Sequence, residues 1–106
     1  MEKYGRLRNL VAKLEGIELI DPPAITDTQI LYAHDPGYLI KIIEGTLSAQ
    51  EQQEIGFPWS EKMVERSRRS AGATVAASKA ALKEGIAANL AGGTHHAYRD
   101  IGSGFC

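Results

Sequence analysis

The amino-acid sequence predicts an α/β protein in which helices pack on a small parallel sheet. Apolar residues recur at helical spacing in several segments, and two short apolar runs of strand length, Ile17–Ile20 and Ile86–Leu90, lie between these segments. The resulting order of helix, strand, helices, long helix and strand is typical of helices layered on a parallel sheet. The 106 residues fit one small domain, residues 1–106, with one modest core.

The first predicted helix covers residues 2–15. Its apolar residues lie three or four positions apart and form one stripe: Tyr4, Leu7, Leu10, Val11 and Leu14. Gly16 suits the left-handed residue that ends a helix. The run Ile17–Ile20 contains β-branched residues and stops at an Asp-Pro-Pro sequence, so it predicts a strand.

Two shorter helices are predicted next. Thr26 and Gln29 have the spacing of a capping box, which predicts a short helix that runs to about Ala33. In HDPGYLIKIIEG, Asp35 is a good N-cap, a proline follows at the first helical position, and Gly45 suits the exit. The polar residues 46–57 are expected to add about one helical turn.

The longest predicted helix covers Glu61–Lys83, with Ser60 as its N-cap and Gly85 as its stop. The stretch SAGATVAASKAAL in its second half consists largely of small side chains. Small side chains let a helix lie close to another backbone, so we expect tight packing against the sheet. The run Ile86–Leu90 that follows is apolar on both faces, as in a buried parallel strand.

The composition excludes several classes of protein. Twelve basic and thirteen acidic residues give a net charge of −1, whereas a nucleic-acid-binding protein would carry a basic excess. One cysteine cannot form an intrachain disulfide, and no apolar run approaches the roughly 20 residues that span a bilayer. With no apolar signal region at the N-terminus, a cytoplasmic protein is expected.

The segment after the second predicted strand carries the candidate chemistry. Ligands of open α/β sheets bind beyond the carboxyl ends of the strands, and AGGTHHAYRDIGSGFC occupies that position. His95 and His96 are candidates for proton transfer because imidazole titrates near neutral pH. Neighbouring residues in an extended segment point to opposite sides, so the pair suits two layers of a pocket better than one metal ion. Taken alone, adjacent histidines are more often surface residues or satisfied polar groups than catalysts.

NLAGGTHHAYRDIGSGFC resembles the histidine-pair segment of the zinc-dependent histone deacetylase superfamily, which includes bacterial acetylpolyamine amidohydrolases and histone deacetylase-like amidohydrolases. HDPGYLIKIIEG and the long helix that starts at FPWSEK also resemble segments of this superfamily, so the resemblance covers nearly the whole chain. It implies part of an arginase/deacetylase-like fold and a hydrolase that deacetylates N-acetylated amines, either acetyl-lysine or acetylpolyamine.

The resemblance also implies roles for individual residues. His96 matches the general base and His95 the histidine that assists it. Gly104 and Phe105 match the substrate-binding Gly-Phe pair, in which the phenylalanine forms one wall of the acyl channel. Cys106 matches a residue beside the acetyl-binding end, although a small buried hydrophobe is an equally good interpretation. Three other residues are expected to pack and hydrogen-bond rather than catalyse: His34, Tyr38 and Trp59.

The resemblance stops short of the metal. In the superfamily, zinc is held by an Asp-x-His motif and a later aspartate, and these positions do not occur in this sequence. We therefore expect no zinc in this chain and no deacetylase activity from it alone. An exposed edge of Ile86–Leu90 would recruit a second chain, so we also expect a homo-oligomer that completes the fold. The alternative function is a non-catalytic, self-associating module that retains part of the deacetylase fold. A metal site shared between subunits, from His95, His96 and Cys106, is a third and weaker hypothesis.

Overall fold

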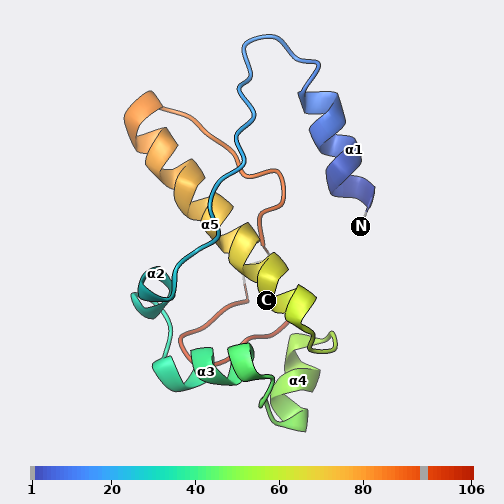
Figure 1. The fold of residues 1–106 in the computed structure, drawn as a ribbon, viewed down its shortest axis with the longest axis vertical. Coiled ribbons are helices and arrows are strands. Elements are labelled where there is room, and N and C mark those ends of the chain that lie inside the picture. Colours follow the sequence, from blue (N-terminus) through green and yellow to red (C-terminus); the bar gives the residue numbers. More distant parts are fainter. Residues whose placement is uncertain (1, 94–95) are drawn as a thin grey trace.

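The computed structural model describes residues 2–93 and 96–106. Within these ranges the chain forms five helices (Figure 1): α1 (Glu2–Val11), α2 (Asp27–Leu31), α3 (Pro36–Glu44), α4 (Ala49–Ile55) and α5 (Glu61–Glu84). The molecule is elongated, with extents of 47 × 29 × 20 Å. No described helix combines the length and the apolarity needed to cross a membrane.

The predicted α/β class is wrong. The described residues contain no strand beyond one isolated antiparallel bridge, between Ala97 and Gly102. Ile17–Ile20 and Ile86–Leu90, the two predicted strands, are irregular chain, and Ile86 is 85% exposed rather than buried. The physical reason is that an apolar β-branched run favours an extended backbone, but a strand also needs a neighbour to pair with, and two short segments rarely form a stable sheet.

The predicted helix starts in the middle of the chain are confirmed. Thr26 Oγ1 accepts from the Gln29 N–H at 3.2 Å and Gln29 Oε1 accepts from the Thr26 N–H at 3.0 Å, which completes the capping box of α2. Asp35 caps α3 by accepting from the Tyr38 N–H at 3.0 Å. Gly45 ends that helix with a φ of 70°, in the left-handed region where glycine is favoured.

The long helix α5 also follows the prediction, and is one residue longer. Ser60 Oγ accepts from the Met63 N–H at 3.0 Å, and Gly85 ends the helix with a φ of 96°. The tight packing expected of its small side chains occurs at the buried Gly72, but its neighbour is the irregular segment 23–25 and not a sheet.

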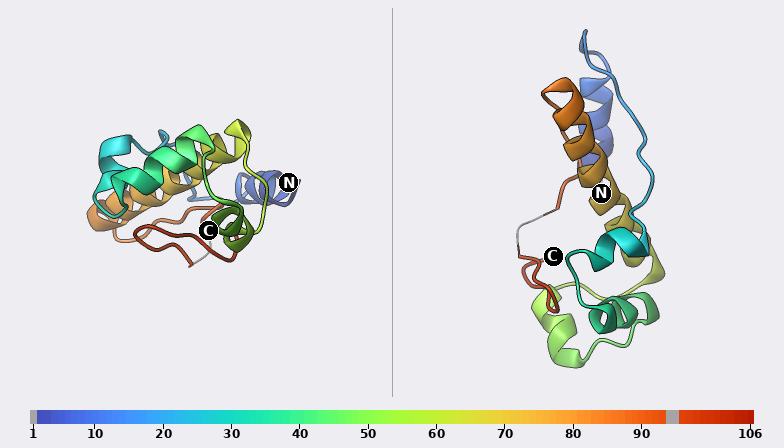
Figure 2. Two further views of the ribbon diagram at one scale, coloured as in Figure 1. Left: turned by 90° about the horizontal axis from the view of Figure 1, so that it is seen from below. Right: turned by 90° about the vertical axis from the view of Figure 1, so that its left-hand side faces the viewer.

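The four helices α2–α5 and the C-terminal segment form the packed part of the molecule. Figure 2 shows α2, α3 and α4 gathered at one end of α5, with the C-terminal segment folded back beside α4. Among the described residues, the buried hydrophobic side chains are Ile55 of α4 and Met63 of α5, which both lie at this end. The core therefore lies beside the segment that carries the predicted site.

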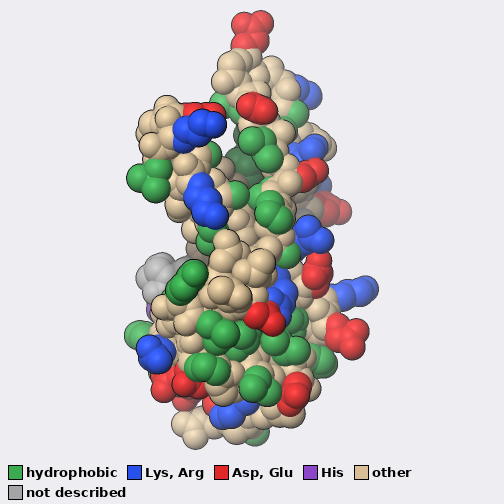
Figure 3. All heavy atoms as spheres, turned by 60° about the vertical axis from the view of Figure 1, so that its left-hand side comes forward, with side chains coloured by type: hydrophobic (Ala, Val, Ile, Leu, Met, Phe, Trp, Pro, Cys, Tyr) green, Lys and Arg blue, Asp and Glu red, His purple; other side chains and the backbone are tan. Residues whose placement is uncertain are grey.

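Helix α1 lies apart from this core. It ends at Val11 and not at residue 15, none of its residues is buried, and among the described residues it contacts no other helix. Large apolar side chains are exposed along this half of the molecule and at the far end of α5: Leu7, Leu10, Leu14, Ile17, Ile20, Leu82 and Ile86. Hydrophobic side chains are visible over both halves of the surface in Figure 3.

Candidate functional site

Residues 96–106 form a compact loop that folds back on itself. The Tyr98 N–H donates to the Ile101 carbonyl at 3.0 Å, and the Ser103 N–H donates to the His96 carbonyl at 3.2 Å. These two bonds flank the antiparallel bridge between Ala97 and Gly102. The loop therefore returns the end of the chain to His96.

Helix α4 holds the end of this loop. The Gly104 N–H donates to the Glu54 carbonyl at 3.2 Å, and the Phe105 N–H donates to the Ile55 carbonyl at 2.8 Å. Carbonyls in the last turn of a helix lack partners within the helix, so they can accept from another segment. This contact was not predicted, because a local sequence pattern does not show which distant N–H groups will meet a helix end.

The predicted site residues of this segment lie together. A Cβ atom added at Gly104 would lie 2.9 Å from Nδ1 of His96, so the imidazole packs directly against the glycine backbone. The His96 N–H donates to Sγ of Cys106 at 3.2 Å. Gly104 and Phe105 both have positive φ values, 55° and 68°, which turn the chain sharply around the histidine. The four residues His96, Gly104, Phe105 and Cys106 thus form one cluster.

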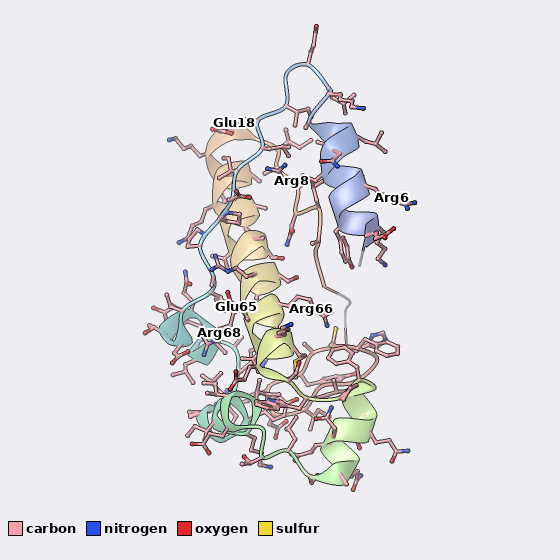
Figure 4. All side chains as sticks on the ribbon, turned by 45° about the vertical axis from the view of Figure 1, so that its right-hand side comes forward. Arg6, Arg8, Glu18, Glu65, Arg66 and Arg68 are labelled. Carbon is pink, nitrogen blue, oxygen red and sulfur yellow. The ribbon has the colours of Figure 1, made fainter. Side chains whose placement is uncertain are left out.

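Phe105 presents its ring on the outside of this cluster. It is 63% exposed and stacks on Phe57, with ring centroids 5.9 Å apart and planes at 17°. The guanidinium of Arg66 lies over the other ring, 5.5 Å from the centroid of Phe57. In Figure 4, Arg66 extends from α5 on the side of the C-terminal segment, whereas Arg68 points the opposite way. Phe57 ends the polar segment 46–57, of which only a helical turn was expected, so this partner of Phe105 was not predicted.

The start of α3 contacts the same loop. His34 Nδ1 lies 2.8 Å from the Tyr98 carbonyl, which confirms that this histidine hydrogen-bonds, as the sequence predicted. Trp59 likewise donates from Nε1 to the Ile42 carbonyl at 2.7 Å. Burial raises the pKa of the Tyr38 hydroxyl above its ordinary value of 10.0, and nearby carboxylates raise it further.

A cavity of about 170 Å³ lies between this loop, α3 and the start of α5. Its lining includes Tyr38, Phe57, Met63, Gly102 and Cys106. Cys106 thus lies between His96 and an apolar space, in line with its alternative interpretation as a small hydrophobe.

The zinc that the family resemblance implies would need a set of protein ligands. Among residues 2–93 and 96–106, no group of three or more histidine, cysteine, aspartate or glutamate residues could hold a metal ion. The described residues therefore do not fit a zinc site. His95, the other predicted catalytic residue, lies outside the described residues. The hypothesis of a metal site shared between subunits includes His95, so that part of it also lies outside the described residues.

Comparison with known proteins identifies the family. The sequence model of the histone deacetylase domain matches residues 1–106. An uncharacterised protein of Picosynechococcus sp. is 38% identical over 110 residues, which cover 100% of this chain and 36% of that protein. Histone deacetylase 2 of Arabidopsis thaliana is 26% identical over 113 residues, which cover 98% of this chain and 29% of that protein.

The chain belongs to the histone deacetylase domain family, as its motifs predicted. It spans about a third of the length of each of these relatives, so the match is to part of a longer protein. Deacetylases of this family use zinc.

Proposed function

We propose that this chain forms the histidine-pair part of an amidohydrolase site that removes the acetyl group from an N-acetylated amine, either acetyl-lysine or an acetylpolyamine. The observation that carries the proposal is the cluster of His96 against Gly104, with Phe105 and Cys106 beside it. It lies in the segment that resembles the family's histidine pair, within a chain that matches the family along its whole length.

In this proposal the two histidines move protons and the Gly-Phe pair shapes the substrate channel. His96 serves as the general base and His95 assists it, while the exposed ring of Phe105 forms one wall for the acyl chain. A positioned acid–base group contributes roughly 10²- to 10⁴-fold to a rate. The described residues hold no zinc ligand set, so the proposal assigns the metal to residues other than these, and we expect no turnover from the isolated chain.

The test places this chain in a longer relative. In the Picosynechococcus protein, the aligned part is replaced by this chain, and zinc-dependent hydrolysis of an acetyl-lysine peptide and of an acetylpolyamine is measured. We expect one of these substrates to be hydrolysed, and His96→Ala to lower kcat by roughly 10²- to 10⁴-fold with little change in KM. Ser78→Ala, at an exposed position of α5, is the matched control.

Two results would contradict the proposal. If the double variant His95→Ala, His96→Ala hydrolysed either substrate as fast as the unchanged chimera, the histidines would have no part in proton transfer. If the isolated chain hydrolysed either substrate in a zinc-dependent manner, the assignment of the metal to other residues would be wrong.

A second candidate is a non-catalytic module that associates with a second copy of itself. It is supported by the exposed apolar side chains of Leu10, Leu14, Leu82 and Ile86, since such surfaces mark interaction sites when they are contiguous. A net charge of −1 opposes self-association only weakly. Sedimentation velocity should then show dimers or larger species, and Ile86→Lys should shift them toward monomer. A monomer at all concentrations would exclude this candidate.

A further inference from the structure

The beginning of α3 contacts the loop of residues 97–102 at three points. Nδ1 of His34 lies 2.8 Å from the carbonyl of Tyr98. The backbone N–H of Asp35 donates to the carbonyl of Arg99 at 2.9 Å. One helical turn further on, the Tyr38 hydroxyl lies against the backbone of Gly102, where an added Cβ would be 3.1 Å from the hydroxyl oxygen. The contacts therefore span both sides of the turn that connects the two halves of the loop.

The helix start fixes the groups that make these contacts. The Asp35 carboxylate caps α3 and accepts from the Tyr38 N–H, and Pro36 sets the backbone of the first turn. His34 and Tyr38 are four residues apart, which places them on one side of the chain at the helix start. Because α3 packs against α5, the contacts tie the loop to the core of the molecule.

The chemistry of each contact is specific. A carbonyl oxygen only accepts, so Nδ1 of His34 carries the proton and donates. It can do so in both the neutral and the charged imidazole, so the contact does not depend on the protonation of Nε2. At Gly102, an added Cβ would lie 3.1 Å from the Tyr38 hydroxyl oxygen and would collide with the carbonyl oxygen of Cys106. The loop at this point therefore lies against the side chain of Tyr38 and the end of the chain at once.

The docked loop sets the position of His96. The Ser103 N–H donates to the carbonyl of His96 at 3.2 Å, directly beyond the bridge that Gly102 forms with Ala97. A loop that moves away from α3 would move this bond, and with it the imidazole that packs on Gly104. Small displacements of about 1 Å in a catalytic group can cost roughly 10²-fold in rate.

We propose that His34 and Tyr38 are positioning residues for His96. They hold the loop of residues 97–102 against α3, so that the imidazole of His96 stays packed against Gly104. The proposal rests on the proposed function for the role of His96, but the contacts and their test do not. Neither residue is assigned a catalytic role, since both act through the loop.

Amide hydrogen exchange of the isolated chain tests the proposal. Tyr38→Phe keeps the ring and removes the hydroxyl, and His34→Ala removes the donor to Tyr98. We expect exchange of the Ser103 N–H to accelerate about fivefold to tenfold in each variant, as for the loss of one polar contact. The N–H of Phe105, which α4 holds, should exchange as in the unchanged chain.

Two further variants separate positioning from a general loss of structure. His34→Asn places an amide N–H near the position of Nδ1 and should restore slow exchange at Ser103. Ile40→Val, at an exposed position of α3, should leave it unchanged. Unchanged exchange at Ser103 in both Tyr38→Phe and His34→Ala would overturn the proposal, as would equal acceleration at Ser103 and Phe105.

The same variants in the chimera connect the contacts to catalysis. Tyr38→Phe and His34→Ala should lower kcat with little change in KM, and His34→Asn should recover most of the loss. An inactive chimera would count against the proposed function while the exchange result would still decide whether α3 positions the loop. An active chimera in which neither variant lowers kcat would overturn the positioning role.

Discussion

Replacing Gly72 by alanine should destabilise this protein, although the same change stabilises most helices. Gly72 is buried on α5 beside the irregular segment that leads to α2. A Cβ atom added there would lie 2.6 Å from the backbone nitrogen of Ile25 and 2.9 Å from the carbonyl carbon of Ala24, and closer still to the carbonyl oxygen of Pro23. All three atoms are backbone, so no side-chain rotation can relieve the contact.

Two opposing terms set the expected magnitude. In a helix interior, glycine to alanine gains about 1 kcal/mol of helix propensity. Overpacking against an immobile neighbour costs about 1–3 kcal/mol. Displacing segment 23–25 would also weaken the 3.0 Å hydrogen bond from the Ile25 N–H to the Arg68 carbonyl, which adds a cost of about 1 kcal/mol. We therefore expect a net loss of about 1–3 kcal/mol in the free energy of unfolding.

Urea unfolding followed by circular dichroism at the helix band measures this loss. Gly5→Ala in α1 is the matched control, because nothing lies within 4 Å of a Cβ added at Gly5. It should raise the helix content, as propensity alone predicts. A Gly72→Ala variant with a higher urea midpoint than the unchanged chain would refute the packing argument.

Three further predictions concern the helices around the site. Trp59→Phe removes the donor to the Ile42 carbonyl and should lower the free energy of unfolding by about 1 kcal/mol, measured by urea unfolding; an unchanged midpoint would contradict this. The hydrogen bond from Lys41 lowers the pKa of Glu51 below its ordinary value of 4.5. The ionised Glu51 therefore stabilises the folded chain above pH 4.5, and this stabilisation is lost as the pH falls below that value. Stability should then decline less in Glu51→Gln than in the unchanged chain on acidification below pH 4.5, and parallel profiles would count against the ion pair. Because burial raises the pKa of Tyr38, the unfolded chain ionises first above pH 10.0, so stability should fall more steeply there than in Tyr38→Phe, and equal slopes would show that the hydroxyl is not buried in solution.

The sequence by itself determined the helices and their boundaries to within a few residues. Thr26, Asp35 and Ser60 begin helices because each side chain bonds a backbone N–H three residues away, and Gly45 and Gly85 end them because glycine accepts a positive φ. These interactions are local, so a short stretch of sequence contains both partners. The longest element, α5, was accordingly predicted to within one residue.

The tertiary structure alone decided what the extended segments and the C-terminal loop contact. Apolar runs such as Ile17–Ile20 predict a strand only if a partner strand is present, and no described segment pairs with them. His96 packs on Gly104 within a loop that contacts His34, just before α3, and Ile55, the last residue of α4, and both lie dozens of residues earlier in the chain. The family motif indicated which residues belong to the site, but its geometry comes from contacts between distant segments, and a local pattern does not contain both sides of such a contact.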